Sequence, residues 1–283
     1  MTQTAYYSEK NLETHRPSPL SDQKIKNEIT NVLTGGIDKN IDKELCVQFI
    51  QKFEQYIFSS TINRFKGHLS FQRKDVILGC TQYIDNLYMQ GNVQVFENDY
   101  RYHERLGRAY IIKKIENLKE TVPLIIAMPF PSTGDMRKDM QSILNQALIK
   151  NIPVHIDGAW MSCCKDIEFD FNHPAIVSFA SSLSKGLGLG WNRIGVRWHK
   201  DQQVNDSISL MNDYNMVIKA AVKIGMHFMQ KFPMDYLWTE HQDHYKKICK
   251  DFNLLETKCI HLAMSGKGPL GVSKLINYLE THV

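Results

Sequence analysis

The chain has 283 residues, 43% hydrophobic and 23% charged, which is typical of a soluble globular enzyme with one large domain or a large and a small one. The formal net charge is only +4 and no run of lysines and arginines stands out, so we expect no nucleic-acid partner. The longest apolar run, 122–131, is too short to span a membrane, the polar start lacks a secretion signal and the six cysteines are scattered, which favours a cytoplasmic protein with reduced thiols.

The first part of the chain is predicted to be an arm followed by two helices. Residues 1–20 are polar and contain two prolines, so we expect a mobile arm there. Residues 24–33 are predicted to form a short helix that ends at Gly35-Gly36. A longer helix is expected over 42–58, where apolar residues recur every three or four positions.

From residue 75 onward, short apolar strands alternate with helices. One helix is expected over 81–89, and another is expected to begin at Thr133 or Asp135 and end at Lys150. The alternation predicts an α/β fold with a mainly parallel, seven-stranded sheet covered on both faces. The expected strands are 76–78, 93–96, 110–112, 124–128, 154–156, 175–179 and 194–198.

The last part of the chain is predicted to be mostly helical. Amphipathic patterns favour helices over 215–231, 245–255 and 271–279. We therefore expect a small C-terminal domain over 205–283, preceded by a large domain over 41–204 and by the arm and short helix of 1–40.

Several polar residues directly follow predicted strands. Asp157 ends one strand, the turn at 79–81 follows another, and Lys185 comes after a third strand and a serine cluster. Ligands gather at the carboxyl ends of parallel strands, and a strand that runs through glycine into a helix presents free N–H groups to an anion. A lysine, a carboxylate and Arg193, eight residues after Lys185, suggest a site for one small anionic aromatic ligand.

The lysine segment resembles a known signature. Ser182-x-Ser184-Lys185 followed by Arg193-x-Gly195 is similar to the lysine motif of the fold type I pyridoxal-phosphate (PLP) aminotransferases, the aspartate aminotransferase superfamily. The resemblance extends from about residue 76 to residue 198, and the Asp-Gly-Ala at 157–159 is similar to the family's Asp-x-Ala segment. It implies a PLP-binding large domain of the fold type I kind, a reduced C-terminal domain and a homodimer.

The resemblance also implies roles for individual residues. Lys185 would form a Schiff base with PLP and shuttle protons, and Asp157 would pair with the pyridine nitrogen so that both serve catalysis. Tyr100 would stack on the ring, with His103 as the alternative stacking residue. The implied cofactor-binding set is Lys185, Asp157, Ser182, Arg193, Gly79, Cys80, Thr81, Tyr100, Ala159, Trp160 and Ser184.

Three departures from the family pattern leave the reaction open. The family's Asn-Pro-x-Gly reads Pro-Ser-Thr-Gly at 131–134, and Trp160 stands where a tyrosine is usual. No arginine follows Trp198, so the substrate carboxylate would be held by another group, such as Arg73 or Arg101, or the substrate would lack one. The resemblance implies an aminotransferase with an amino donor and a keto acceptor. The alternatives are a PLP-dependent decarboxylase or lyase, and a catalytically silent relative.

Overall fold

The computed structural model describes residues 6–13, 18, 20–34 and 44–282. The predicted helix end at Gly35-Gly36, the predicted helix start at residue 42 and half of the predicted arm lie outside these residues. The two predicted N-terminal helices are confirmed where the structure describes them, as α2 (Gln23–Thr34) and α3 (Glu44–Phe58).

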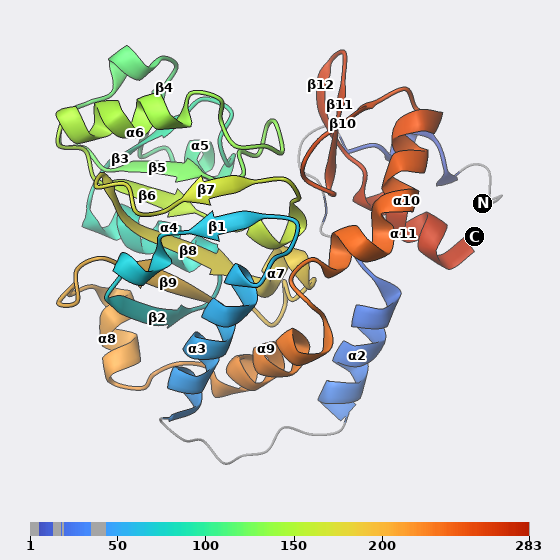
Figure 1. The fold of residues 1–283 in the computed structure, drawn as a ribbon, viewed down its shortest axis with the longest axis horizontal. Helices are drawn as coiled ribbons and strands as arrows, with labels where there is room; N and C mark the ends of the chain where they lie inside the picture. Colours follow the sequence, from blue (N-terminus) through green and yellow to red (C-terminus); the bar gives the residue numbers. More distant parts are fainter. Residues whose placement is uncertain (1–5, 14–17, 19, 35–43, 283) are drawn as a thin grey trace.

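A seven-stranded sheet organises the chain, in the order β2-β9-β8-β6-β5-β3-β4 (Figure 1). Its pairs are parallel, except that β9 runs antiparallel to both β2 and β8. This confirms the prediction of a mainly parallel seven-stranded sheet. Its strands are β2 (Arg73–Ile77), β3 (Val93–Phe96), β4 (Ala109–Ile112), β5 (Leu124–Ala127), β6 (Val154–Asp157), β8 (Ile176–Ser182) and β9 (Gly195–His199).

Helices cover both faces of this sheet because neighbouring strand residues point to opposite sides. Phe179 of β8 belongs to a core cluster that includes residues of α3, α6 and α9, whereas the next residue, Ala180, belongs to a cluster built around α4. Trp198 of β9 stacks on Phe179 with ring centroids 4.5 Å apart. The covering helices are α4 (Cys80–Gln90), α5 (Tyr102–Leu106), α6 (Met140–Ile149), α8 (Ser207–Asp213) and α9 (Lys219–Lys231).

The predicted start of the helix after β5 is wrong. α6 begins at Met140, and the preceding loop closes as a bridge in which the Phe130 N–H donates to the Asp135 carbonyl at 2.8 Å. Gly134 sits there in the left-handed region at φ +64°, a conformation that a helix does not contain. The backbone from Phe130 to Asp135 is therefore a turn at the carboxyl end of β5, not a first helical turn.

The C-terminal part contains a sheet that the sequence patterns did not predict. Strands β10 (Leu255–Glu256), β11 (Leu262–Ser265) and β12 (Gly268–Gly271) form an antiparallel sheet, flanked by α10 (Tyr236–Asp251) and α11 (Ser273–His282) (Figure 1). α10 begins nine residues before the predicted start at residue 245. The mostly helical prediction missed this sheet because β12 is held by pairing with β11 rather than by strand-forming residues. The proposed division at residue 204 stays a prediction.

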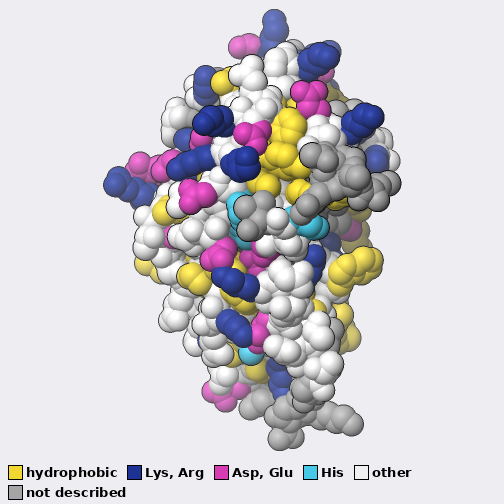
Figure 2. All heavy atoms as spheres, turned by 90° about the vertical axis from the view of Figure 1, so that its right-hand side faces the viewer, with side chains coloured by type: hydrophobic (Ala, Val, Ile, Leu, Met, Phe, Trp, Pro, Cys, Tyr) yellow, Lys and Arg dark blue, Asp and Glu magenta, His cyan; other side chains and the backbone are white. Residues whose placement is uncertain are grey.

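The remaining elements are short. A two-stranded parallel sheet pairs β1 (Arg64–Lys66) with β7 (Glu168–Asp170). Lysine, arginine and acidic side chains are interspersed on the face shown in Figure 2. Among the described residues, no helix is long and apolar enough to cross a membrane. The short helices not yet named are α7 (Leu183–Gly186) and the 3-10 turns η1 (Glu9–Asn11), η2 (His68–Ser70), η3 (Ile115–Asn117) and η4 (Met161–Cys163).

Candidate active site

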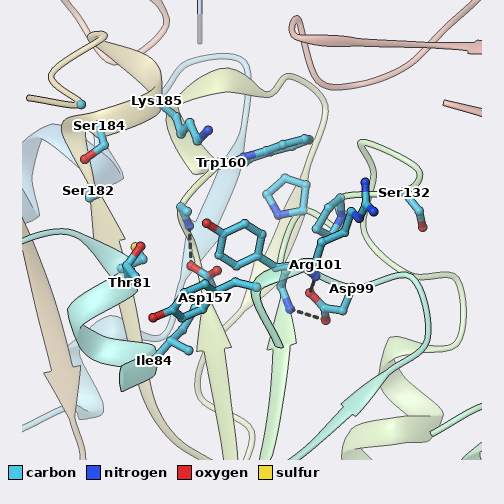
Figure 3. Close-up of a pocket in the computed structure, with 18 of the residues that line it drawn as sticks. Thr81, Ile84, Asp99, Arg101, Ser132, Asp157, Trp160, Ser182, Ser184 and Lys185 are labelled. Carbon is cyan, nitrogen blue, oxygen red and sulfur yellow. Dashed lines mark hydrogen bonds between the residues drawn. The ribbon is translucent and has the colours of Figure 1, made fainter. Parts of the chain in front are cut away.

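A cavity of about 600 Å³ lies at the carboxyl ends of β3, β5, β6 and β8. Its walls come from the loops that follow these strands and from the first turn of α4 (Figure 3). Within the predicted cofactor-binding set of eleven residues, Gly79 alone does not line the cavity, and it lies directly beside Arg193, which does. The structure thus brings together these ten predicted residues along the cavity wall: Lys185, Asp157, Ser182, Arg193, Cys80, Thr81, Tyr100, Ala159, Trp160 and Ser184.

Asp157 is the last residue of β6 and is 5% exposed. One of its carboxylate oxygens accepts a 3.0 Å hydrogen bond from the Ala159 N–H. Burial raises the pKa of Asp157 to about 6, although the Cys80 thiol and the positive charge of Lys185 favour its ionised form. At neutral pH this residue is a buried carboxylate that can hold a positive charge or a proton donor of a ligand.

Lys185 belongs to α7, the short helix that directly follows β8. α7 packs tightly on η4, since a Cβ at Gly186 would lie 2.0 Å from the Ser162 hydroxyl oxygen. Figure 3 shows Lys185 and Trp160 on one side of the cavity and Asp157 on the other. The glycine after the lysine is therefore needed for the close approach that fixes Lys185 at the cavity wall.

The start of α4 and Arg193 form an anion-binding cradle. Gly79 precedes the helix at φ +81°, and no side chain caps the helix N-terminus. The Arg193 Nε donates to the Leu78 carbonyl at 2.9 Å, which brings Nη2 within 2.9 Å of where a Cβ at Gly79 would lie. Ser184 Oγ lies 3.3 Å from the same point and is buried without a hydrogen-bond partner among the described residues. Free N–H groups, a guanidinium and a hydroxyl converge there.

Other predicted residues lie on the same side of the cavity as the cradle. Cys80 is buried, and desolvation raises the pKa of its thiol well above the ordinary value, with the nearby Asp157 adding to the shift. The thiol is therefore neutral and serves as a weak donor rather than as a nucleophile. Thr81, Ser182 and Ser184 gather on one side of the cavity in Figure 3.

The two candidate stacking residues lie in different places. Tyr100 lines the cavity and stacks on Tyr102 with ring centroids 5.7 Å apart. His103 is buried, its Nδ1 lies 2.9 Å from the Tyr88 hydroxyl, and burial lowers its pKa to about 4. Of the two, Tyr100 is the one that reaches the cavity.

Sequence reasoning missed a second buried carboxylate in the cavity. Asp99 accepts hydrogen bonds from the Tyr100 N–H at 2.6 Å and from the Ala127 N–H at 3.1 Å. Burial raises its pKa to about 7, and the charge of Asp157 adds to this shift. The position shortly after β3, at the same sheet edge as Asp157, was the one signal that could have indicated this residue.

Of the two arginines proposed to hold the substrate carboxylate, only one lies at the cavity. Arg73 lies away from the cavity and is bound to acidic groups, with Nε 3.0 Å from Asp75 and Nη2 2.8 Å from Asp213. Arg101 lines the cavity, as does Arg105. The structure therefore excludes Arg73 from this site and retains Arg101.

Comparison with known proteins identifies the fold. No family model and no curated protein sequence matches the chain. Among solved structures, tyrosine aminotransferase from Leishmania infantum is similar with a TM-score of 0.65 and 12% identity, over 100% of this chain and 98% of that one. Aspartate aminotransferase from Thermotoga maritima is similar with a TM-score of 0.64 and 12% identity, over 95% of this chain and 90% of that one. The PLP-bound C-S lyase from Staphylococcus hominis is similar with a TM-score of 0.62 and 10% identity, over 87% of this chain and 73% of that one. At these identities the likeness establishes the fold, and it confirms the predicted fold type I architecture.

Proposed function

We propose that this chain is a PLP-dependent aminotransferase that acts on an amino acid or a related amine. The observation that carries the proposal is the convergence of Lys185, the buried Asp157 and the Arg193 cradle on one cavity. The same fold carries the two aminotransferases and the PLP-bound lyase named above, which supports PLP as the cofactor.

The residues present fit PLP. Its phosphate is suited to the cradle, because a Cβ at Gly79 would fill the space there and Ser184 Oγ is buried without a described partner. Its pyridine nitrogen is suited to Asp157, the buried carboxylate across the cavity from Lys185. We assign phosphate binding to Arg193, Ser182, Ser184 and the start of α4, and ring stacking to Tyr100.

The protein groups would divide the chemistry between them. Bound PLP supplies an electrophilic carbon and a ring that withdraws electrons from the substrate Cα. Lys185 provides the amine that binds the cofactor, and then accepts and returns the Cα proton. Asp157 would hold the proton of the ring nitrogen, and the cradle would hold the phosphate so that the cofactor is oriented toward Lys185.

The test is a cofactor titration followed by a donor screen. Purified protein should take up PLP and become yellow, and an amino donor should shift the spectrum while a keto acid restores it. Release of ammonia with an unsaturated or keto product, without a requirement for an acceptor, would assign the protein to the lyases instead. Loss of CO₂ would assign it to the decarboxylases. A protein that stays colourless after PLP is added would be a silent relative, and the proposal would be wrong.

The affinity for PLP is expected to depend on the ionisation of Asp157. The carboxylate must be ionised to hold the pyridinium proton, so cofactor affinity should be full above the pKa of about 6 and fall as the pH drops below it, by up to about tenfold per pH unit. The comparison is the PLP dissociation constant of the wild type and Asp157→Asn from pH 5 to pH 8. Asp99 and the cofactor titrate in both proteins, so equal pH profiles would contradict the assignment.

We further propose that the protein acts in the cytoplasm as a homodimer. The family resemblance supports the dimer, and so does Trp191, which lines the cavity and is 99% exposed. A second subunit would cover such a surface. The cytoplasmic location is proposed from the sequence alone. Sedimentation equilibrium of the PLP-loaded protein should give twice the chain mass of 32.8 kDa. A strictly monomeric protein would show that the resemblance does not extend to assembly.

A further inference from the structure

Two arginines on the cavity wall are left without a described partner. Arg101 directly precedes α5, Arg105 lies in the last turn of this short helix, and both line the cavity. Neither guanidinium makes an ion pair or a hydrogen bond with any residue that the structure describes. Three other arginines are engaged with acidic groups, namely Arg73, Arg137 and Arg197. Guanidinium groups left unpaired at a cavity are available to an anion that enters it.

The position of Arg101 differs from that of the cradle. Figure 3 shows Arg101 and Ser132 on the side of the cavity opposite Thr81 and Ser182, with Trp160 and Asp157 between the two sides. A ligand whose phosphate lies in the cradle therefore leaves Arg101 free to contact a second anionic group.

The C-terminal part offers no competing cation. After Trp198 the only residue lining the cavity, in the described chain, is Pro269. Lys258 is 3.0 Å from Asp135, and Lys274 is 3.3 Å from Glu13. No arginine follows Trp198 at all. Among the described residues, the arginines that line the cavity all belong to the large sheet and its loops.

We propose that Arg101 binds the carboxylate of the substrate, so that the substrate is an amino acid rather than a simple amine. This inference rests on the proposed function and names its substrate class. The planar guanidinium can donate two parallel hydrogen bonds to a carboxylate, and it cannot make such a contact with the neutral carboxamide of the same amino acid. Arg101 is thus a specificity-determining residue supplied by the loop after β3.

The test uses the PLP-loaded protein and spectral titrations. The probes are the twenty proteinogenic amino acids and, for the one that binds most tightly, its carboxamide and its decarboxylated amine. The wild type should bind the amino acid in preference to both analogues. In Arg101→Gln the apparent dissociation constant of the amino acid should rise about tenfold to a hundredfold, while that of the carboxamide stays within about twofold. Arg101→Lys should fall between them.

Arg108→Gln is the matched control, because Arg108 is an exposed arginine of the same segment that does not line the cavity. It should bind all probes as the wild type does. PLP uptake should be unchanged in every variant, which separates this inference from the proposed function. Three results would overturn the inference and leave PLP binding intact. The wild type could take up PLP but bind only amines or none of the probes. Arg101→Gln could keep wild-type affinity for the amino acid, or the loss of affinity could appear only in Arg105→Gln.

Discussion

Replacing Lys185 by alanine is expected to abolish the covalent attachment of PLP and to lower turnover by at least about 10³-fold. The proposed mechanism uses this amine twice, as the group that binds the cofactor carbon and as the base at the substrate Cα. Borohydride reduction followed by mass spectrometry of the digested protein should find PLP on the peptide that contains Lys185 in the wild type and on no peptide in the variant. The non-covalent affinity for PLP should fall less, because the cradle at Gly79 and Arg193 is untouched.

Lys138→Ala is the control for this experiment, since Lys138 is exposed and does not line the cavity. It should retain full attachment and turnover. Attachment to a different lysine in the wild type, or undiminished turnover in Lys185→Ala, would show that the resemblance of this segment to the family signature is misleading.

A large effect on stability is expected from Arg197→Met, about 3–5 kcal/mol of the free energy of unfolding. Arg197 is 1% exposed, and its Nη2 lies 2.5 Å from Asp75, which is equally buried on the neighbouring strand β2. Its Nη1 also binds Asp206, the residue that caps α8. Removing the guanidinium leaves buried carboxylates with part of their compensation gone, which costs more than the lost attraction itself. Urea denaturation monitored by tryptophan fluorescence measures the change.

Asp213→Asn provides the contrast. Asp213 binds Arg73 at 2.8 Å in the same charged group, but its side chain is 57% exposed. Its loss should cost less than about 1 kcal/mol, as for other exposed ion pairs. Similar costs for the two substitutions would mean that the buried group is no more important than a surface pair, against the burial seen for Arg197.

The central sheet and most residues of the candidate site could be predicted from the sequence because both depend on local patterns. Continuous apolar runs mark buried parallel strands, and residues such as Asp157 and Lys185 follow these runs directly. Their convergence then follows from the geometry of a parallel sheet. Lys185 was also part of a motif with few alternative interpretations.

The rest depends on contacts that local patterns do not encode. Asp99 lies in a loop without a motif, and it is distinguished only by its burial and by the cavity beside it. Arg101 was named from the sequence together with Arg73, and only the position of the cavity separates the two. Likewise, β12 contains glycine and proline and is a strand only because it pairs with β11. The turn before α6 was mistaken for a helix because its hydrogen bond joins Phe130 to Asp135 across the loop.

The cavity takes nearly all of its wall from loops of a single sheet, with Pro269 as the described contribution from the last part of the chain. In the proposed enzyme, the group that holds the cofactor and the group that selects the substrate would therefore both lie on loops of this one sheet. Substrate binding at Arg101 would not need to draw the C-terminal part across the opening. Substrate selection could then be re-engineered within the single segment from Asn98 to Arg105.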